Sequence, residues 1–210
     1  NGNTAGWCKL FADGMGGYKA GEVASGIAVR TVMSLVKEAV EREDLSLRDP
    51  ATGMSRAGIL LRDAIHRANK IIYQTAKTQA NCEGMGTTVV AGIFFDDKLT
   101  VAHVGDSRLY CLRGSEFRQV TQDHSLLQEL VSRGFYTPEE AHRAAAKNYV
   151  TRALGVELTV DVDVTEVPVL KDDLYLLCSD GLSDMVEDED IHLTISTFGG
   201  NLEMLAKQLV

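Results

Sequence analysis

Three aspartates, Asp13, Asp106 and Asp180, share the same local context in this 210-residue chain. Each stands at the end of a short apolar segment and beside a glycine, and the segments are Trp7 to Ala12, Val101 to Val104 and Leu174 to Cys178. Apolar runs of this length are typical of buried strands and are too short for helices. Glycine next to the acid lets another group approach the main chain closely. We therefore predict three carboxylates at strand ends, each with accessible backbone beside it.

These acids have a definite chemistry if the three strand ends share one edge. Two carboxylates about 4 Å apart repel each other by about 4 kcal/mol at an effective dielectric constant near 20. Either their pKa values rise or a cation lies between them. Carboxylate and carbonyl oxygens are the ligands that Mg²⁺, Mn²⁺ and Ca²⁺ prefer. A helix cap or a turn explains any one of the acids equally well, but the threefold repetition favours a metal site.

Composition and charge exclude several classes of partner. The chain has 21 basic and 30 acidic residues, a net charge of −9, and no cluster of Lys and Arg. We therefore expect no nucleic acid and no anionic membrane as a partner. No apolar run approaches the roughly 20 residues that a membrane span needs, so we expect no membrane insertion in this segment. The four cysteines are scattered and form no C-x-x-C pair, which favours reduced packing residues in a cytoplasmic protein.

Hydrophobic periodicity predicts the elements that must position the acids. Apolar residues recur every three or four positions near residues 20–42 and 54–78, which indicates two amphipathic helices packed as a pair. The β-branched segments between residues 87 and 120 predict an antiparallel meander. A helix pair followed by hairpins predicts an α+β fold with helices laid on a sheet. The expected strands are residues 87–95, 99–104, 107–112, 117–120, 158–164 and 173–178.

The motifs around the acids carry a resemblance that covers nearly the whole chain. They are Ala12-Asp13-Gly14-Met15-Gly16-Gly17, Ala20-Gly21-Glu22-Val23-Ala24-Ser25, Met85-Gly86-Thr87-Thr88, His103-Val104-Gly105-Asp106-Ser107-Arg108, Thr121-Gln122-Asp123-His124-Ser125-Leu126, Thr151-Arg152-Ala153-Leu154-Gly155 and Cys178-Ser179-Asp180-Gly181-Leu182-Ser183-Asp184. In order and spacing this set closely resembles bacterial-type, type-2C metal-dependent protein serine/threonine phosphatases, the PPM family. The resemblance implies an α+β fold, a four-layer α/β/β/α sandwich of two antiparallel sheets flanked by helix pairs.

The same resemblance implies a site with two Mn²⁺ or Mg²⁺ ions, or three. By it, Asp13 bridges both core ions, the Gly14 carbonyl binds one of them, Asp180 binds the other, and Asp106 with Asp180 holds a looser third ion. Asp13 and Asp180 then act in catalysis as holders of the metal-activated water. Residues 125–149, the flap, lie where the family selects substrate. The implied substrate is phosphoserine or phosphothreonine in a protein, and we expect a monomer that counteracts a serine/threonine kinase.

Departures from the family pattern leave an alternative open. The family has an acidic ligand and often a phosphate-binding Arg upstream of the glycine turn, and a late Asp beyond Val210; neither region is among these residues. We expect a single phosphatase domain over 1–210 that lacks its N-terminal strand and its C-terminal strand or strands. The alternative is a catalytically impaired phosphatase-like module that binds a phosphoprotein or regulates a partner.

Two other patterns have competing interpretations. Asp161-Val162-Asp163-Val164-Thr165 fits the D-x-D-x-T nucleophile motif of haloacid-dehalogenase-like phosphatases, but too few residues follow for the rest of such a site, and strand alternation explains the spacing. His103 and His124 are candidates to approach the metal site. A structural role, in which each histidine bonds a turn or fills the sheet, is the favoured interpretation.

Overall fold

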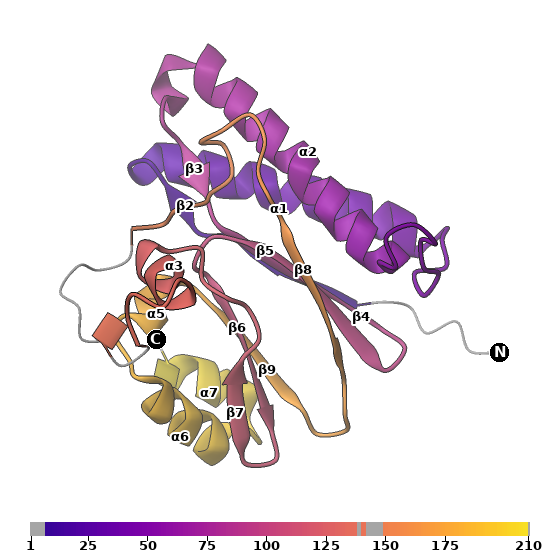
Figure 1. Ribbon diagram of the computed structural model, residues 1–210, viewed down its shortest axis with the longest axis vertical. Coiled ribbons are helices and arrows are strands. Elements are labelled where there is room, and N and C mark those ends of the chain that lie inside the picture. Colours follow the sequence, from indigo (N-terminus) through magenta and orange to yellow (C-terminus); the bar gives the residue numbers. More distant parts are fainter. Residues whose placement is uncertain (1–6, 138–139, 142–148, 210) are drawn as a thin grey trace.

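A four-stranded antiparallel sheet forms the centre of the molecule (Figure 1). The computed structural model describes residues 7–137, 140–141 and 149–209. The first sheet has the order β1-β4-β5-β8. Its central strands are apolar on both faces, as expected for strands covered on two sides. The strands are β1 (Trp7–Phe11), β4 (Val89–Phe95), β5 (Lys98–Val104) and β8 (Asp163–Pro168).

Two long helices, α1 (Tyr18–Val40) and α2 (Arg56–Thr78), cover one face of the first sheet. Alanines at four-residue spacing, such as Ala24 and Ala28, are fully buried and let the helices pack closely. Ser55 caps α2 because its side chain accepts a hydrogen bond from the Gly58 amide. A short 3₁₀ turn, η1 (Ala80–Cys82), follows α2. The predicted helix pair is thus confirmed, with each start shifted by two residues.

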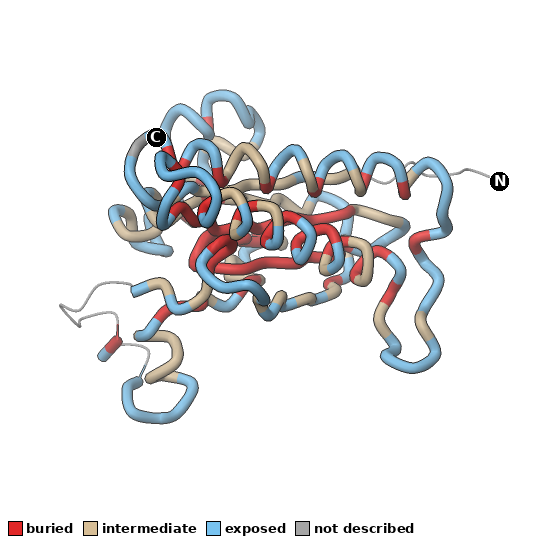
Figure 2. Tube along the Cα trace, turned by 90° about the horizontal axis from the view of Figure 1, so that it is seen from above, coloured by how far each residue is buried: buried red, intermediate tan, exposed pale blue. Residues whose placement is uncertain are grey.

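A second sheet of order β7-β6-β9 packs against the other face of the first sheet. Leu109 and Leu177 of the second sheet meet Val90 and Val101 of the first in one apolar layer. Two helices cover the outer face of the second sheet. Figure 1 shows the resulting layers, which confirm the predicted α/β/β/α sandwich, and Figure 2 shows the buried positions gathered in the interior. The elements are β6 (Arg108–Arg113), β7 (Glu116–Gln119), β9 (Leu174–Cys178), α6 (Asp188–Phe198) and α7 (Leu202–Leu209).

The predicted single meander is wrong. β4 and β5 form a hairpin in the first sheet, whereas β6 and β7 form one in the second. The chain passes between the sheets at Gly105, whose φ of 107° is rarely adopted by other residues. A Cβ at this position would lie 2.6 Å from Thr88 Cγ2. Two successive hairpins have the same alternation as a meander, so the sequence pattern does not reveal which strands share a sheet.

The return to the first sheet also differs from the expectation. The strand predicted at 158–164 is β8 and begins only at Asp163. The segment before it is irregular because Asn69 of α2 binds its main chain, donating to the carbonyls of Glu157 and Leu158. The flap, residues 125–149, contains α3 (Leu126–Ser132). The sequence also predicts a helical piece in the flap at 139–146, and most of that range lies outside the described residues.

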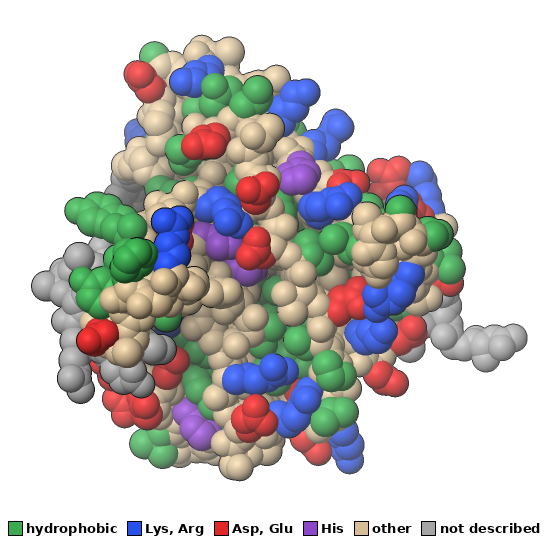
Figure 3. Space-filling model, in the orientation of Figure 1, with side chains coloured by type: hydrophobic (Ala, Val, Ile, Leu, Met, Phe, Trp, Pro, Cys, Tyr) green, Lys and Arg blue, Asp and Glu red, His purple; other side chains and the backbone are tan. Residues whose placement is uncertain are grey.

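The charged side chains on the surface and the four cysteines are arranged as their sequence pattern predicts. Acidic and basic side chains alternate over the face shown in Figure 3, without a broad basic patch on that face. All four cysteines are free thiols, and Cys82, Cys111 and Cys178 are buried. Among the described residues, no helix is both long and apolar enough to cross a bilayer.

The fourth layer can be tested at α6. Ile191 is fully buried against the second sheet, whereas Leu193 on the same helix is 65% exposed. We expect Ile191→Ala to lower the free energy of unfolding by about 3 kcal/mol because it leaves a cavity. Leu193→Ala should change it by less than about 0.5 kcal/mol. Urea unfolding of both variants measures the difference, and equal effects would mean that α6 does not cover the sheet.

Candidate metal centre

Strand register brings Asp13 and Asp106 to the same edge of the first sheet. β1 and β5 both pair antiparallel with β4, so they run in the same direction. Phe11 and His103 are both paired with Val90, which places the two strand ends level. Asp13 follows the end of β1 at Phe11 by two residues, and Asp106 follows the end of β5 at Val104 by two residues.

The second sheet brings Asp180 to this edge as well. Arg108, the first residue of β6, pairs with Cys178, the last residue of β9. Asp106 lies two residues before Arg108, and Asp180 lies two residues after Cys178. Asp180 is also the first residue of the short helix α5 (Asp180–Ser183). The crossing between the sheets therefore brings Asp106 and Asp180 to the edge where Asp13 lies, and the charge of Asp180 acts on both of the other acids.

The electrostatics of the acids show that they interact. Burial, followed by the charge of Asp180, raises the pKa of Asp13, while a hydrogen bond from the Gly14 backbone lowers it. Burial and then Asp180 raise the pKa of Asp106 to about 6, and Asp184 adds to this effect. Both shifts have the causes predicted for convergent carboxylates without a bound cation.

Asp106 has an oxygen that lacks any partner. Its side chain is almost fully buried, and its Oδ2 atom is the one buried side-chain nitrogen or oxygen of the described residues without a hydrogen bond. An unpaired buried carboxylate oxygen is costly unless a cation satisfies it. The oxygen donors and the excess of negative charge fit a hard divalent ion such as Mg²⁺ or Mn²⁺.

Two threonines fix the backbone of Asp13, and the sequence motif gave no hint of their role. The Asp13 carbonyl accepts hydrogen bonds from the Thr88 amide at 2.9 Å and from the Thr87 hydroxyl at 2.7 Å. Thr88 Oγ1 in turn accepts from the Asp13 amide and lies 2.6 Å from Ser107 Oγ. Thr88 thus links the turn at Asp13 to the crossing next to Asp106. The signal that marks them is two adjacent threonines directly before the apolar strand β4, both of them buried.

The glycines beside Asp13 are required by close packing. Gly14 begins β2 (Gly14–Met15), which pairs with β3 (Gly86–Thr87). A Cβ on Gly14 would lie 2.1 Å from the Gly21 carbonyl oxygen at the start of α1, and a Cβ on Gly21 would meet Gly14 in the same way. The helix therefore lies directly on the Asp13 turn.

Comparison with known proteins agrees with this geometry. Residues 2–208 match the protein phosphatase 2C family. The chain belongs to that family. Serine/threonine phosphatase Stp of Listeria welshimeri is 42% identical over 182 residues, which are 87% of this chain and 69% of the relative. Serine/threonine protein phosphatase PstP of Mycobacterium tuberculosis is 40% identical over 182 residues, 86% of this chain and 32% of the relative.

Solved phosphatase structures share the fold of this phosphatase 2C chain. The crystal structure of M. tuberculosis PstP has a TM-score of 0.77 at 37% identity and covers 90% of this chain and 74% of its own. A second structure, the catalytic domain of PstP in complex with two manganese ions, has a TM-score of 0.72 at the same identity and the same coverage. The resemblance inferred from the motifs is confirmed.

A second group of potential ligands in this phosphatase 2C chain has a different character. Ligand atoms of His103, His124 and Asp163 lie within 4.8 Å of one another. Each ring, however, already uses one nitrogen: His103 Nε2 bonds the Gln122 carbonyl, and His124 Nδ1 accepts from the Gly105 amide. Arg152 supplies a positive charge, with Nη1 2.9 Å from Asp163 Oδ1. We therefore interpret this group as structural, in agreement with the favoured interpretation of both histidines.

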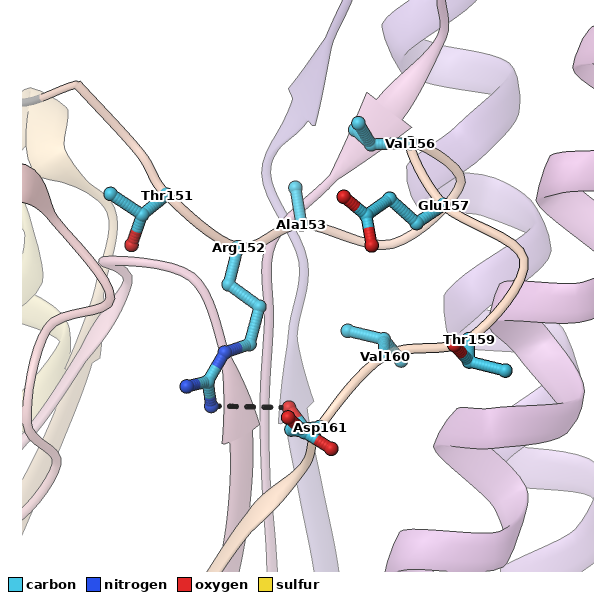
Figure 4. Close-up of a pocket in the computed structure, with 8 residues that line it drawn as sticks. All are labelled: Thr151, Arg152, Ala153, Val156, Glu157, Thr159, Val160 and Asp161. Carbon is cyan, nitrogen blue, oxygen red and sulfur yellow. Dashed lines mark hydrogen bonds between the residues drawn. The ribbon is translucent and has the colours of Figure 1, made fainter.

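Arg152 also borders a polar pocket of about 230 Å³ beside the end of the flap. Figure 4 shows the residues that line it and the hydrogen bond from Arg152 to the Asp161 carbonyl. Asp13, Asp106 and Asp180 do not line this pocket. Asp163 lies in β8 with alternating exposure and is bound to Arg152, so strand alternation accounts for the D-x-D-x-T pattern.

The cost of burying Asp106 can be measured without metal. Because its folded-state pKa of about 6 lies above the unfolded value of 3.8, this carboxyl destabilises the metal-free protein progressively as pH rises from about 3.8 to about 6, and fully above that range. We expect Asp106→Asn to raise the free energy of unfolding at pH 7.5 by about 2 kcal/mol, and by less than about 0.5 kcal/mol at pH 4. Urea unfolding in EDTA at both pH values measures this. The exposed Asp97→Asn is the control, and a destabilised Asp106→Asn at pH 7.5 would contradict the expectation.

Proposed function

We propose that this chain hydrolyses phosphoserine and phosphothreonine in proteins with the help of Mn²⁺ or Mg²⁺. The observation that carries the proposal is the unpaired buried oxygen of Asp106 at an edge shared with Asp13 and Asp180. Relatives named as serine/threonine phosphatases support the substrate class. The manganese ions of the PstP complex support the choice of metal.

In this proposal the three acids and one carbonyl hold two ions, or three. Asp13, the Gly14 carbonyl and Asp180 would hold the two core ions, and Asp106 with Asp180 would hold a third. Bound divalent ions acidify water and neutralise phosphoryl oxygens, which is the chemistry that phosphoester hydrolysis needs at neutral pH. The chain's own part is to hold Asp13 rigidly through Thr87 and Thr88.

The alternative of a non-catalytic binding module lacks a supporting observation. A scaffold gains nothing from keeping a carboxylate whose pKa is raised to about 6 by burial and by the charge of Asp180. Buried ionisable groups that lower the stability of the fold are typical of catalytic sites. The acids therefore favour hydrolysis over simple phosphoprotein binding.

Activity should depend on metal and on the acids. We expect purified protein to release phosphate from phosphoserine and phosphothreonine peptides with Mn²⁺ and to lose this activity in EDTA. Asp13→Asn and Asp180→Asn should each lower kcat by at least about 100-fold, because a neutral amide binds and bridges a divalent ion poorly. Malachite-green detection of phosphate measures the rates, and circular dichroism checks the fold.

The exposed Asp97→Asn is the matched control and should keep native kinetics. Turnover that persists in EDTA, or no turnover with any divalent metal, would refute the proposal. Variants of Asp13 and Asp180 that unfold rather than lose activity would instead assign these acids a structural role.

The proposed reaction also suggests an opposing enzyme. A phosphoprotein phosphatase consumes the product of a serine/threonine kinase, so we propose that the chain counteracts such a kinase. We further propose that it acts as a monomer in the cytoplasm, for which its four free thiols are suited. Size-exclusion chromatography with light scattering should give the mass of one chain, and a dimer mass would contradict the monomer.

A further inference from the structure

His124 joins the crossing between the sheets to the end of the flap. Its backbone amide donates to the Gly105 carbonyl at 3.0 Å, and its ring Nδ1 accepts from the Gly105 amide at 3.0 Å. Its own carbonyl accepts from the Thr151 amide at 2.9 Å. Next to it, Ser125 and Val150 form a β-bridge. One residue therefore contacts both the Asp106 turn and the two ends of the flap.

The hydrogen bond from the Gly105 amide determines which nitrogen of the His124 ring carries the proton. Since Nδ1 accepts a hydrogen bond from the backbone, the proton of the neutral ring is on Nε2, which lies 3.2 Å from Asp163 Oδ2. Arg152 Nη1 lies 3.1 Å from Nε2 as well, but its own acceptor is Asp163 Oδ1 at 2.9 Å, so the ring and the guanidinium share the Asp163 carboxylate. The ring of His103 stacks on that of His124 with centroids 4.7 Å apart. Burial, together with His103, lowers the pKa of His124, which keeps Nδ1 free to accept at neutral pH.

This contact matters because the Asp106 carboxyl takes a hydrogen bond from its own backbone. The Oδ2 atom of Asp106 has no hydrogen-bond partner. The direction of the carboxylate therefore depends on the backbone that carries it. That backbone begins at Gly105, in a conformation with positive φ and in close contact with Thr88. The reciprocal pair of hydrogen bonds with His124 holds the Gly105 backbone in place in addition to the packing against Thr88.

We propose that His124 is a positioning residue for Asp106, through the hydrogen bond between its Nδ1 atom and the Gly105 amide. The inference rests on the proposed function, because its consequence is tighter binding of the divalent ion that Asp106 would hold. Partners behind a metal ligand typically affect metal affinity by 10-fold to 100-fold. Asp163 supports the arrangement because its carboxylate accepts from the ring proton on Nε2, and Arg152 holds Asp163 in place.

Three substitutions separate the two ring nitrogens. His124→Asn places an amide oxygen near the position of Nδ1, so it can still accept from Gly105. His124→Gln places its polar group near the position of Nε2, and His124→Leu has no acceptor. We expect His124→Asn to bind Mn²⁺ within about threefold of the native protein at the weakest site. His124→Gln and His124→Leu should bind about 10-fold more weakly there.

Electron paramagnetic resonance of free Mn²⁺ gives these affinities without any assay of activity. Hydrogen exchange of the Gly105 amide should remain slow in His124→Asn and become faster in the other two variants. His192→Gln is the matched histidine control. Asp163→Asn is a milder test, which applies even if His124→Leu does not fold. In this variant we expect ¹⁵N spectra to show a mixture of His124 tautomers, and we expect Mn²⁺ to bind about threefold more weakly.

The outcomes are distinguishable. Equal weakening in all three His124 variants, or in none, overturns the positioning role, as does a changed tautomer in Asp163→Asn with unchanged Mn²⁺ affinity. If the native protein binds no Mn²⁺, the proposed function fails. In that case, faster Gly105 exchange only in His124→Gln and His124→Leu would still establish the hydrogen bond, but without a role toward a cation.

Discussion

The burial of the Asp106 carboxylate beside Asp180 is the constraint on which this structure depends. Its pKa is raised to about 6 by burial and by Asp180, and its Oδ2 atom has no hydrogen-bond partner. A hydrogen bond from its own backbone does not offset this cost, because the pKa stays raised, so the rest of the fold must hold the acids together against their repulsion. The sandwich does this by anchoring each acid just beyond a strand whose register is fixed by a buried face.

The rigidity of the site comes from backbone contacts more than from side-chain contacts. Thr87 and Thr88 bind both the amide and the carbonyl of Asp13, and α1 approaches so closely that only glycine fits at Gly14. The crossing at Gly105 is enclosed by Thr88 on one side and His124 on the other. Because these hydrogen bonds are made to the main chain, the carboxylate oxygens stay available for an ion. Hydrogen bonds to the carboxylates themselves would occupy those oxygens.

Charge is distributed differently at the two polar clusters. At the three acids negative charge accumulates without a basic partner that satisfies Asp106 Oδ2. At His124 and Asp163 the charge is balanced by Arg152, and both histidines keep one nitrogen bonded to backbone. Proximity of potential ligands therefore does not distinguish a metal site from a structural cluster, whereas the balance of charge and the unsatisfied atom do.

The sequence by itself determined the features that depend on neighbours along the chain. These are the two amphipathic helices, the strands before Asp13, Asp106 and Asp180, and the family motifs. Only the tertiary structure decided that the chain changes sheets at Gly105 and that His124 binds there. Both depend on register between distant strands, and a two-residue period has the same appearance whichever sheet a strand joins. Burial of Asp106 without a donor likewise arises only when three segments meet, because local sequence does not contain the position of a partner atom.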